Sequence, residues 1–133
     1  MSHDKDIRWK QRFHNFEKAY LFLAESIATP SPSKLEIAGI VQAFEFTFEL
    51  GWKTLKDFLE SKDVVVNFPR DIIKEAFRVQ LIVDGETWLD MLDKRNLMSH
   101  TYNETNAAAA MKLIREKYFQ ALDGVYGSLK KMT

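Results

Sequence analysis

Hydrophobic residues recur every three or four positions along most of this chain, and that spacing predicts helices rather than strands. The first such series lies between residues 4 and 28, with successive intervals of four, three, four, three and four. Its members are Trp9, Phe13, Phe16, Tyr20, Leu23 and Ile27. This spacing lines them along one helix face, as in the seam between the helices of a bundle. We therefore expect a first long helix over residues 4–28.

A polar segment with two prolines, residues 29–33, interrupts the pattern. Proline cannot continue a helix, and it disfavours helical backbone in the residue before it. The segment ends in Ser33-Lys34-Leu35-Glu36, which has the form of a capping box. A second long helix should therefore run from Lys34 to about Ser61.

The second helix carries an unusually wide apolar surface. One face comprises Ile37, Val41, Phe44, Phe48, Trp52, Leu55 and Leu59. Phe46, Leu50 and Phe58 lie off that line, so the apolar surface is wider than one neighbouring helix needs. We expect a third helix or a second copy of the chain to cover the remainder.

Three more helices are expected after residue 68, and each has its own apolar face. Pro69 suits the first turn of a short helix, whose apolar residues are Ile72, Ile73, Ala76, Phe77 and Leu81. Another short helix should follow the Asp84-Gly85 turn, from Glu86 to about Ser99, with Trp88, Leu89, Met91 and Leu92 inward. A last long helix should begin near residues 103–105 and reach about Lys131, with Met111, Ile114, Tyr118, Ala121, Val125 and Leu129 in register. The chain is thus predicted to be all-α, one domain over residues 1–133 that forms an antiparallel up-and-down bundle of three long and two short helices.

Composition narrows the classes of function. Nineteen basic residues balance nineteen acidic ones, so any RNA binding must use a local patch, and this balance weighs against a general RNase. The chain has no cysteine, and His3, His14 and His100 lack the spacing of metal ligands, so we expect no metal and no cofactor. The polar start and the lack of a run of about 18 apolar residues predict a cytoplasmic protein with no signal peptide and no membrane span.

One segment of the second half concentrates reactive side chains. It reads Asp93-Lys94-Arg95-Asn96-Leu97-Met98-Ser99-His100-Thr101-Tyr102. Arginine binds phosphate through a fixed fork of donors, histidine exchanges protons near neutral pH, and tyrosine offers a hydroxyl that can be modified. Metal-free RNA cleavage is then chemically possible. His100 would move a proton at the ribose 2'-hydroxyl or the leaving oxygen, Arg95 would stabilise the charged phosphorane, and Asn96 could orient either group.

Helix geometry restricts this catalytic hypothesis. Each residue of a straight helix turns by about 100°, so His100 would lie roughly 140° around the axis from Arg95. A joint site requires the helix to end near Ser99, or a second subunit to supply one member. The alternative is structural: Arg95 pairs with Asp90 or Asp93, while His100 caps a helix end and Tyr102 packs its ring.

A polar stripe follows the aromatic second helix at intervals of three and four residues: Gln42, Glu45, Glu49 and Lys53. One interpretation is a solvated helix edge, in which Glu49 and Lys53 form a weak ion pair. The other places the stripe in the same cleft as Arg95, where a carboxylate could orient the guanidinium. The first interpretation is slightly favoured.

The chain resembles the nucleotidyltransferase substrate-binding protein family, a part of the HEPN superfamily, over nearly its whole length. Two runs carry the resemblance: the arginine motif continued through Asn103-Glu104, and Gln42-Ala43-Phe44-Glu45-Phe46-Thr47-Phe48-Glu49-Leu50-Gly51-Trp52-Lys53. The resemblance implies a HEPN-like helical bundle that forms a homodimer. It also implies a partner chain, a minimal (MNT-type) nucleotidyltransferase that this protein serves as substrate-binding subunit, as a two-component or toxin–antitoxin pair.

The same resemblance implies an alternative function. In related members the HEPN chain is a metal-independent RNase, and its partner neutralises it by adding AMP to the tyrosine. Arg95 and His100 would then be catalytic, Asn96 supporting, and Tyr102 the modified residue, with RNA or a nucleotide as ligand. A purely structural helical interaction protein is the remaining alternative, and it predicts that Tyr102 is never modified.

Overall fold

The computed structural model describes the backbone of residues 2–98 and 103–133, and the side chains of residues 3–95, 103 and 105–133. These residues form helices and no strands, which confirms the all-α prediction. The elements are α1 (Ser2–Ile27), α2 (Lys34–Ser61), α3 (Pro69–Arg78), α4 (Gly85–Met98), α5 (Glu104–Leu113), a π-helical segment η1 (Ile114–Tyr118) and α6 (Phe119–Lys130). In the described ranges, no helix combines the length and the apolar character that crossing a membrane requires.

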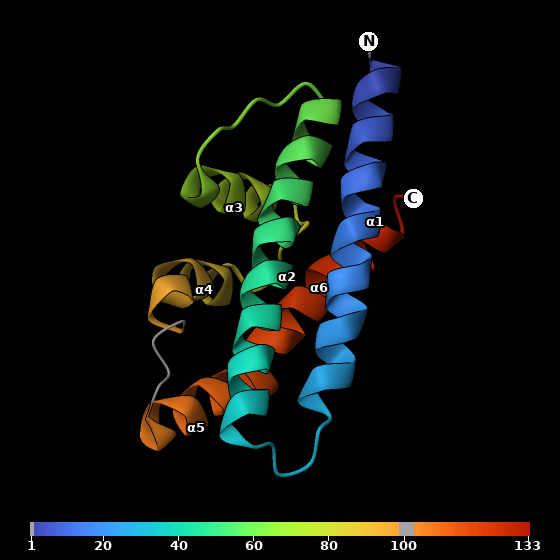
Figure 1. The fold of residues 1–133 in the computed structure, drawn as a ribbon. Helices are drawn as coiled ribbons and strands as arrows, with labels where there is room; N and C mark the ends of the chain where they lie inside the picture. The colour runs from blue at the N-terminus through green and yellow to red at the C-terminus, as the bar shows by residue number, and fades with distance from the viewer. Residues whose placement is uncertain (1, 99–102) are drawn as a thin grey trace.

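The helices form a HEPN-like antiparallel bundle, as predicted. The long helices α1 and α2 pack side by side and run in opposite directions, while α5, η1 and α6 form the third long element behind them (Figure 1). The short helices α3 and α4 lie on the other side of α2 (Figure 1). This arrangement places α2 at the centre of the fold, in contact with every other α-helix.

Local signals explain the start of α2. Ser33 and Glu36 form the predicted capping box: the Glu36 N–H donates to Ser33 Oγ at 3.1 Å, and the Ser33 N–H donates to Glu36 Oε1 at 2.8 Å. Each bond satisfies a backbone donor that the first helical turn leaves open. Pro69 occupies the first turn of α3, also as predicted.

Aromatic residues of the core join α2 to its neighbours. Phe44 stacks on Tyr118 of η1 with ring centroids 5.3 Å apart, and Phe48 lies 5.5 Å from Trp88 of α4. Phe58, one of the residues predicted to widen the apolar surface, is buried edge-on against Trp9 of α1. The contact between Phe48 and Trp88 fixes α4 against the middle of α2, which positions the functional site.

Two features of the fold differ from the sequence pattern. Phe77, grouped with the buried residues of α3, is 53% exposed and lies against the start of α4, where a Cβ atom at Gly85 would come within 3.0 Å of its ring. The last long helix, predicted as continuous, contains the π-helical turn η1. Arg115 of this turn donates to the carbonyl oxygens of Ile27, the last residue of α1, and of Thr29 in the loop that follows.

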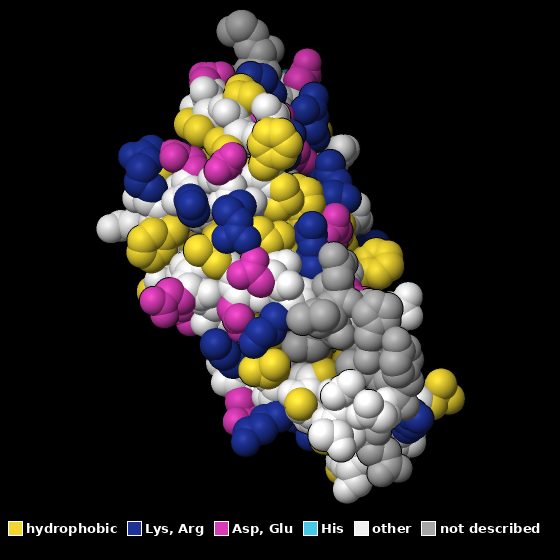
Figure 2. Space-filling view, turned by 90° about the vertical axis from the view of Figure 1, so that its left-hand side faces the viewer, with side chains coloured by type: hydrophobic (Ala, Val, Ile, Leu, Met, Phe, Trp, Pro, Cys, Tyr) yellow, Lys and Arg dark blue, Asp and Glu magenta, His cyan; other side chains and the backbone are white. Residues whose placement is uncertain are grey.

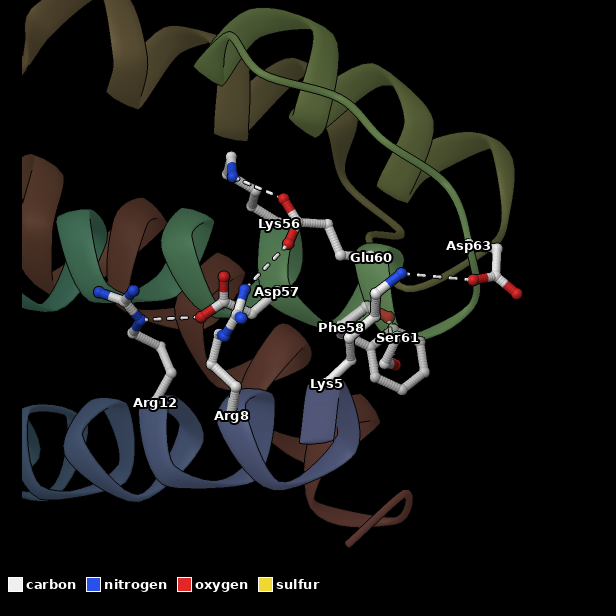
Figure 3. A network of polar contacts seen from close by, with 9 residues as sticks. All are labelled: Lys5, Arg8, Arg12, Lys56, Asp57, Phe58, Glu60, Ser61 and Asp63. Atoms are coloured by element: carbon white, nitrogen blue, oxygen red, sulfur yellow. Dashed lines mark hydrogen bonds and ion pairs between the residues drawn. The ribbon is translucent and has the colours of Figure 1, made fainter. Parts of the chain in front are cut away.

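A ladder of ion pairs joins α1 to α2 on one side of the molecule (Figure 3). Arg12 Nε donates to Asp57 Oδ2 at 3.0 Å, and Asp57 is only 5% exposed. Arg8 lies 3.5 Å from Glu60, a carboxylate that also accepts a hydrogen bond from Lys56 Nζ at 2.7 Å. Removal of Arg12 would therefore leave a buried carboxylate without this ion pair, whereas removal of Arg8 would leave Glu60 paired with Lys56.

We expect Arg12→Met to lower the free energy of unfolding by about 1–3 kcal/mol, because it leaves the buried Asp57 carboxylate without its partner. Arg8→Met should cost at most about 1 kcal/mol, since this pair is exposed and Glu60 keeps Lys56. Urea denaturation of both variants measures the difference. Equal losses would show that burial of Asp57 does not govern the strength of this ladder.

A second polar contact joins α1 to α6. Tyr126 donates to Glu17 Oε2 at 2.6 Å, and Lys130 Nζ approaches the same oxygen at 3.0 Å. These contacts hold the pKa of Glu17 below its usual 4.5, and the bond to Glu17 together with burial raises the pKa of Tyr126 to about 12. Because the carboxylate form is favoured in the folded state, the contact stabilises the fold above the ordinary pKa of Glu17 and is lost as the pH falls.

Tyr126→Phe should therefore destabilise the protein by about 1 kcal/mol near neutral pH. The difference from the wild type should shrink as the pH falls below the ordinary 4.5 and through the lowered pKa of Glu17, because the protonated carboxyl loses its preference for the folded state. Thermal or urea unfolding over this pH range tests the expectation. A difference that stays constant with pH would mean that the tyrosine contributes by packing alone.

Candidate functional site

A groove of about 680 Å³ opens between α2 and the last turns of α4. It is lined by Gln42, Glu45, Phe46, Glu49, Leu50, Trp52, Lys53 and Arg95. Seven of these residues come from α2, where spacings of three and four place them along one side of the helix. The stripe predicted from the sequence, Gln42, Glu45 and Glu49, thus lines the same groove as Arg95.

Arg95 reaches the groove because α4 is packed against α2 through Trp88. One guanidinium nitrogen, Nη1, lies 3.8 Å from Glu49 Oε2. This distance is too long for a hydrogen bond, so the contact is a loose ion pair. Both side chains keep solvent access, 33% for Arg95 and 42% for Glu49. The guanidinium is therefore oriented by a carboxylate yet still accessible to an anion in solution.

Glu49 has two further partners on its own helix. Trp52 Nε1 donates to Glu49 Oε2 at 3.1 Å, and Lys53 Nζ lies 3.6 Å from Oε1. The i, i+4 pair of the solvated-edge interpretation is therefore present, and so is the groove of the other interpretation. The sequence pattern does not identify Trp52 as a site residue, because its spacing assigns it to the apolar face, yet its indole N–H is the donor that holds Glu49.

The structural alternative for Arg95 is wrong in its choice of partner. Asp93 pairs with Arg70 of α3 at 2.5 Å. Asp90 accepts a hydrogen bond from Tyr118 at 2.6 Å and lies near two lysines, Lys94 and Lys117. Burial favours the protonated form of Asp90, but the Tyr118 hydrogen bond and the two lysines outweigh it and lower its pKa. Both carboxylates are thus engaged with other residues, while Arg95 turns to α2.

Three predicted residues of the motif lie outside this description. Asn96 belongs to α4, but its side chain is not among those described, and His100 and Tyr102 fall between the described ranges. Asn103 opens α5 as its N-cap and accepts a hydrogen bond from the Asn106 N–H at 2.8 Å. The roles of Asn96, His100 and Tyr102 therefore stay predictions.

The described residues of the groove form no metal site. No group of three or more histidine, aspartate or glutamate side chains is arranged there to hold an ion. Its charged groups are two carboxylates, Glu45 and Glu49, and two cations, Lys53 and Arg95. Such a groove can bind an anion at the cations while its carboxylates orient them.

The chain is a helical bundle, and Arg95, the first residue of the arginine motif, lines its groove. This is the architecture of the HEPN-like substrate-binding fold. The chain belongs to the family described as nucleotidyltransferase substrate binding protein like, whose family model matches residues 11–131. The resemblance inferred from the two sequence runs is thereby confirmed.

Solved structures of similar proteins share the fold. A crystal structure of a Thermus thermophilus protein is 34% identical, with a TM-score of 0.78, and the match covers 86% of this chain and 98% of that one. A Haemophilus influenzae protein is 28% identical, with a TM-score of 0.66, over 92% of this chain and 96% of that one. Its structure is described as revealing the fold of a substrate binding domain of a nucleotidyltransferase.

A curated relative is named for an activity. The protein named "Probable ribonuclease HepT" of Haemophilus influenzae is 40% identical over 78 residues. The match covers 55% of this chain and 53% of that relative, so it spans about half the length of each.

Proposed function

We propose that this protein is the HEPN-type partner of a minimal (MNT-type) nucleotidyltransferase, with which it acts as a two-component or toxin–antitoxin pair. The family match over residues 11–131 carries the proposal. The description of the Haemophilus influenzae structure as a substrate-binding domain supports it. Within the pair, this chain is the substrate or the substrate-binding subunit, and the other chain carries out the nucleotidyl transfer.

The residue that receives the nucleotide is Tyr102. Its hydroxyl oxygen would attack the α-phosphorus of ATP, form a phosphodiester with AMP, and release pyrophosphate.

The test is to mix the protein with a small nucleotidyltransferase encoded beside its gene, to measure their association, and then to add ATP and record the intact mass. We expect a stable complex and a mass increase of one AMP unit that Tyr102→Phe abolishes. Failure to associate at micromolar concentrations would overturn the partnership, and a purely structural role would leave the mass unchanged.

A second candidate function, a metal-independent endoribonuclease, is supported by the position of Arg95 on the groove and by the ribonuclease name of the curated relative. In this reaction His100 takes the proton from a ribose 2'-hydroxyl, whose oxygen attacks the adjacent phosphorus. The bond to the 5'-oxygen of the next nucleotide breaks, and that oxygen takes a proton from water and leaves as a hydroxyl. Arg95 stabilises the charge on the phosphorane, and Asn96 orients one of these groups. The two functions are compatible, because the partner could switch off the ribonuclease by adding AMP to Tyr102, as the family resemblance implies.

A homodimer would bring two copies of the arginine motif together. A second groove, of about 370 Å³ between α1 and α2, shares Gln42 and Phe46 with the first. It is apolar, and its aromatic residues are largely exposed: Phe22 by 60% and Phe46 by 64%. Since exposed aromatic patches of this kind favour association, we place the dimer contact on this surface.

Phe22→Glu should convert the dimer to a monomer, because it buries a charge in an apolar contact. Sedimentation or light scattering over a range of concentrations measures the change. Leu35→Glu, also on an exposed apolar residue (83%) but outside the second groove, is the matched control and should leave the dimer intact. A wild-type protein that is monomeric at high micromolar concentration would overturn the homodimer.

A further inference from the structure

The two oxygens of the Glu49 carboxylate face two different cations. Oε1 lies 3.6 Å from Lys53 Nζ, and Oε2 lies 3.8 Å from Arg95 Nη1. A single anionic group thus bridges a lysine and an arginine that come from different helices. This is the arrangement that a phosphate group would adopt if it replaced the carboxylate.

The present contacts are weak enough to be exchanged. Both distances exceed those of a charged hydrogen bond, and each of the three side chains is between 33% and 42% exposed. Ion pairs of this kind contribute little net free energy. A phosphate has more acceptor oxygens than a carboxylate and matches the guanidinium fork, so it can displace Glu49 from both cations.

Other contacts keep the two cations in place when the carboxylate moves. Lys53 Nζ lies 5.7 Å from the centre of the Trp52 ring, a cation–π contact that limits its motion. Arg95 is carried by α4, which Trp88 anchors to the core. Trp52 is also the donor that holds Glu49 at 3.1 Å, so one indole side chain contacts both the lysine and the competing carboxylate.

We propose that Lys53 and Arg95 form a two-cation clamp for a phosphodiester of RNA, and that Glu49 occupies this clamp until the phosphate displaces it. The inference rests on the proposed ribonuclease function and adds a phosphate-binding lysine and a competing carboxylate to it. The balance of nineteen basic and nineteen acidic residues means that RNA binding needs such a local clamp. Figure 2 shows positive and negative side chains interspersed over the described part of the face formed by α3 and α4, rather than a continuous basic strip.

The experiment measures binding of a fluorescent single-stranded RNA by anisotropy at several salt concentrations. All proteins carry His100→Ala, so the RNA is not cleaved during the measurement. Lys53→Gln should weaken binding several-fold and reduce the slope of log K against log salt by about 0.7, the value for one lost contact to a single strand. Glu49→Gln should tighten binding by about two- to fivefold, because it removes the competing charge.

Two controls match these changes in charge. Lys18→Gln removes a positive charge and Glu25→Gln a negative one, both at exposed positions of α1 outside the groove. They should change affinity by less than the groove variants do. If each control variant changes RNA affinity as much as the groove variant that it matches, overall charge explains the binding and the clamp is wrong.

The outcomes separate this inference from the function on which it rests. If Arg95→Ala weakens RNA binding but Lys53→Gln and Glu49→Gln leave it unchanged, the clamp is wrong and the ribonuclease proposal stands. If the wild-type groove binds no RNA, both are wrong. A parallel titration with ATP distinguishes the source of the phosphate: ATP binding with the same response to the variants, without RNA binding, would assign the clamp to a nucleotide and overturn the RNA assignment.

Discussion

Replacing Arg95 with alanine is expected to reduce RNA cleavage about 100- to 1,000-fold, the typical effect of removing one donor that stabilises charge in a transition state. The guanidinium reaches the groove from α4, and its contact with Glu49 there is a loose ion pair. It can therefore turn toward a phosphorane without leaving a buried charge behind. The measurement is the rate of cleavage of a defined RNA by purified protein with an excess of a metal chelator, since the proposed reaction uses no metal.

The matched control for this experiment is Arg70→Ala. Arg70 is another partly exposed arginine that pairs with a single carboxylate, Asp93, but it lies on α3 and does not line the groove. We expect near-normal cleavage from this variant. Arg95→Lys should recover only part of the activity, because an ammonium group cannot reproduce the two-donor fork. Full activity of Arg95→Ala, with an unchanged helical spectrum, would contradict the ribonuclease proposal.

The sequence predicts the helices well because one physical rule governs most of them. Buried residues at intervals of three and four define α1 and α2, and the prolines at positions 30 and 32 separate them. The predicted ends lie within a few residues of those observed. The same spacing predicted that the stripe Gln42, Glu45 and Glu49 shares one side of α2, since positions on a helix face follow from the sequence alone.

Contacts between helices were harder to predict. The choice between Asp90, Asp93 and Glu49 as the partner of Arg95 depends on how α4 docks against α2. Spacing alone favours the two carboxylates on the same helix. Helix periodicity says nothing about which distant side chain faces a given residue. The structure resolves the choice because Arg70 and Tyr118 occupy the two aspartates.

The π-helical turn and the exposure of Phe77 show another limit of periodicity. A single extra residue in η1 changes the hydrogen bonding without disturbing the apolar pattern on either side, so Ile114 and Tyr118 remain buried as predicted. Phe77 has the spacing of a core residue, but α3 is short and α4 begins beside it at Gly85. Its ring therefore packs at the edge of the fold and remains half exposed.

The largest effect on stability is expected from a substitution of Trp88, which packs α4 against α2. Trp88 is 1% exposed, lies against Phe48, and donates its indole N–H to the carbonyl oxygen of Ala121 at 3.3 Å. Its ring also faces Gly51, where a Cβ atom would come within 3.1 Å of Trp88 Cη2. The glycine thus allows α4 to approach α2 closely, and the tryptophan fills the space between them.

Trp88→Ala should lower the free energy of unfolding by about 3–5 kcal/mol, since it opens a large cavity among three helices. That is a large share of the roughly 5–15 kcal/mol that stabilises a domain. Phe68→Ala, on an aromatic residue that is 70% exposed, should cost less than about 1 kcal/mol. Urea denaturation measures both values, and a loss below about 1 kcal/mol for Trp88→Ala would mean that α4 is not closely packed.

The same variant also tests how the fold supports the site. Because α4 carries Arg95, loosening its contact with α2 should move the guanidinium away from Glu49 and from any bound phosphate. Cleavage by the folded fraction of Trp88→Ala should therefore fall, although Trp88 itself does not line the groove. Trp88→Phe keeps an aromatic ring against Phe48 and should retain more of both stability and activity. Normal cleavage by a destabilised Trp88→Ala protein would show that the position of Arg95 does not depend on this contact.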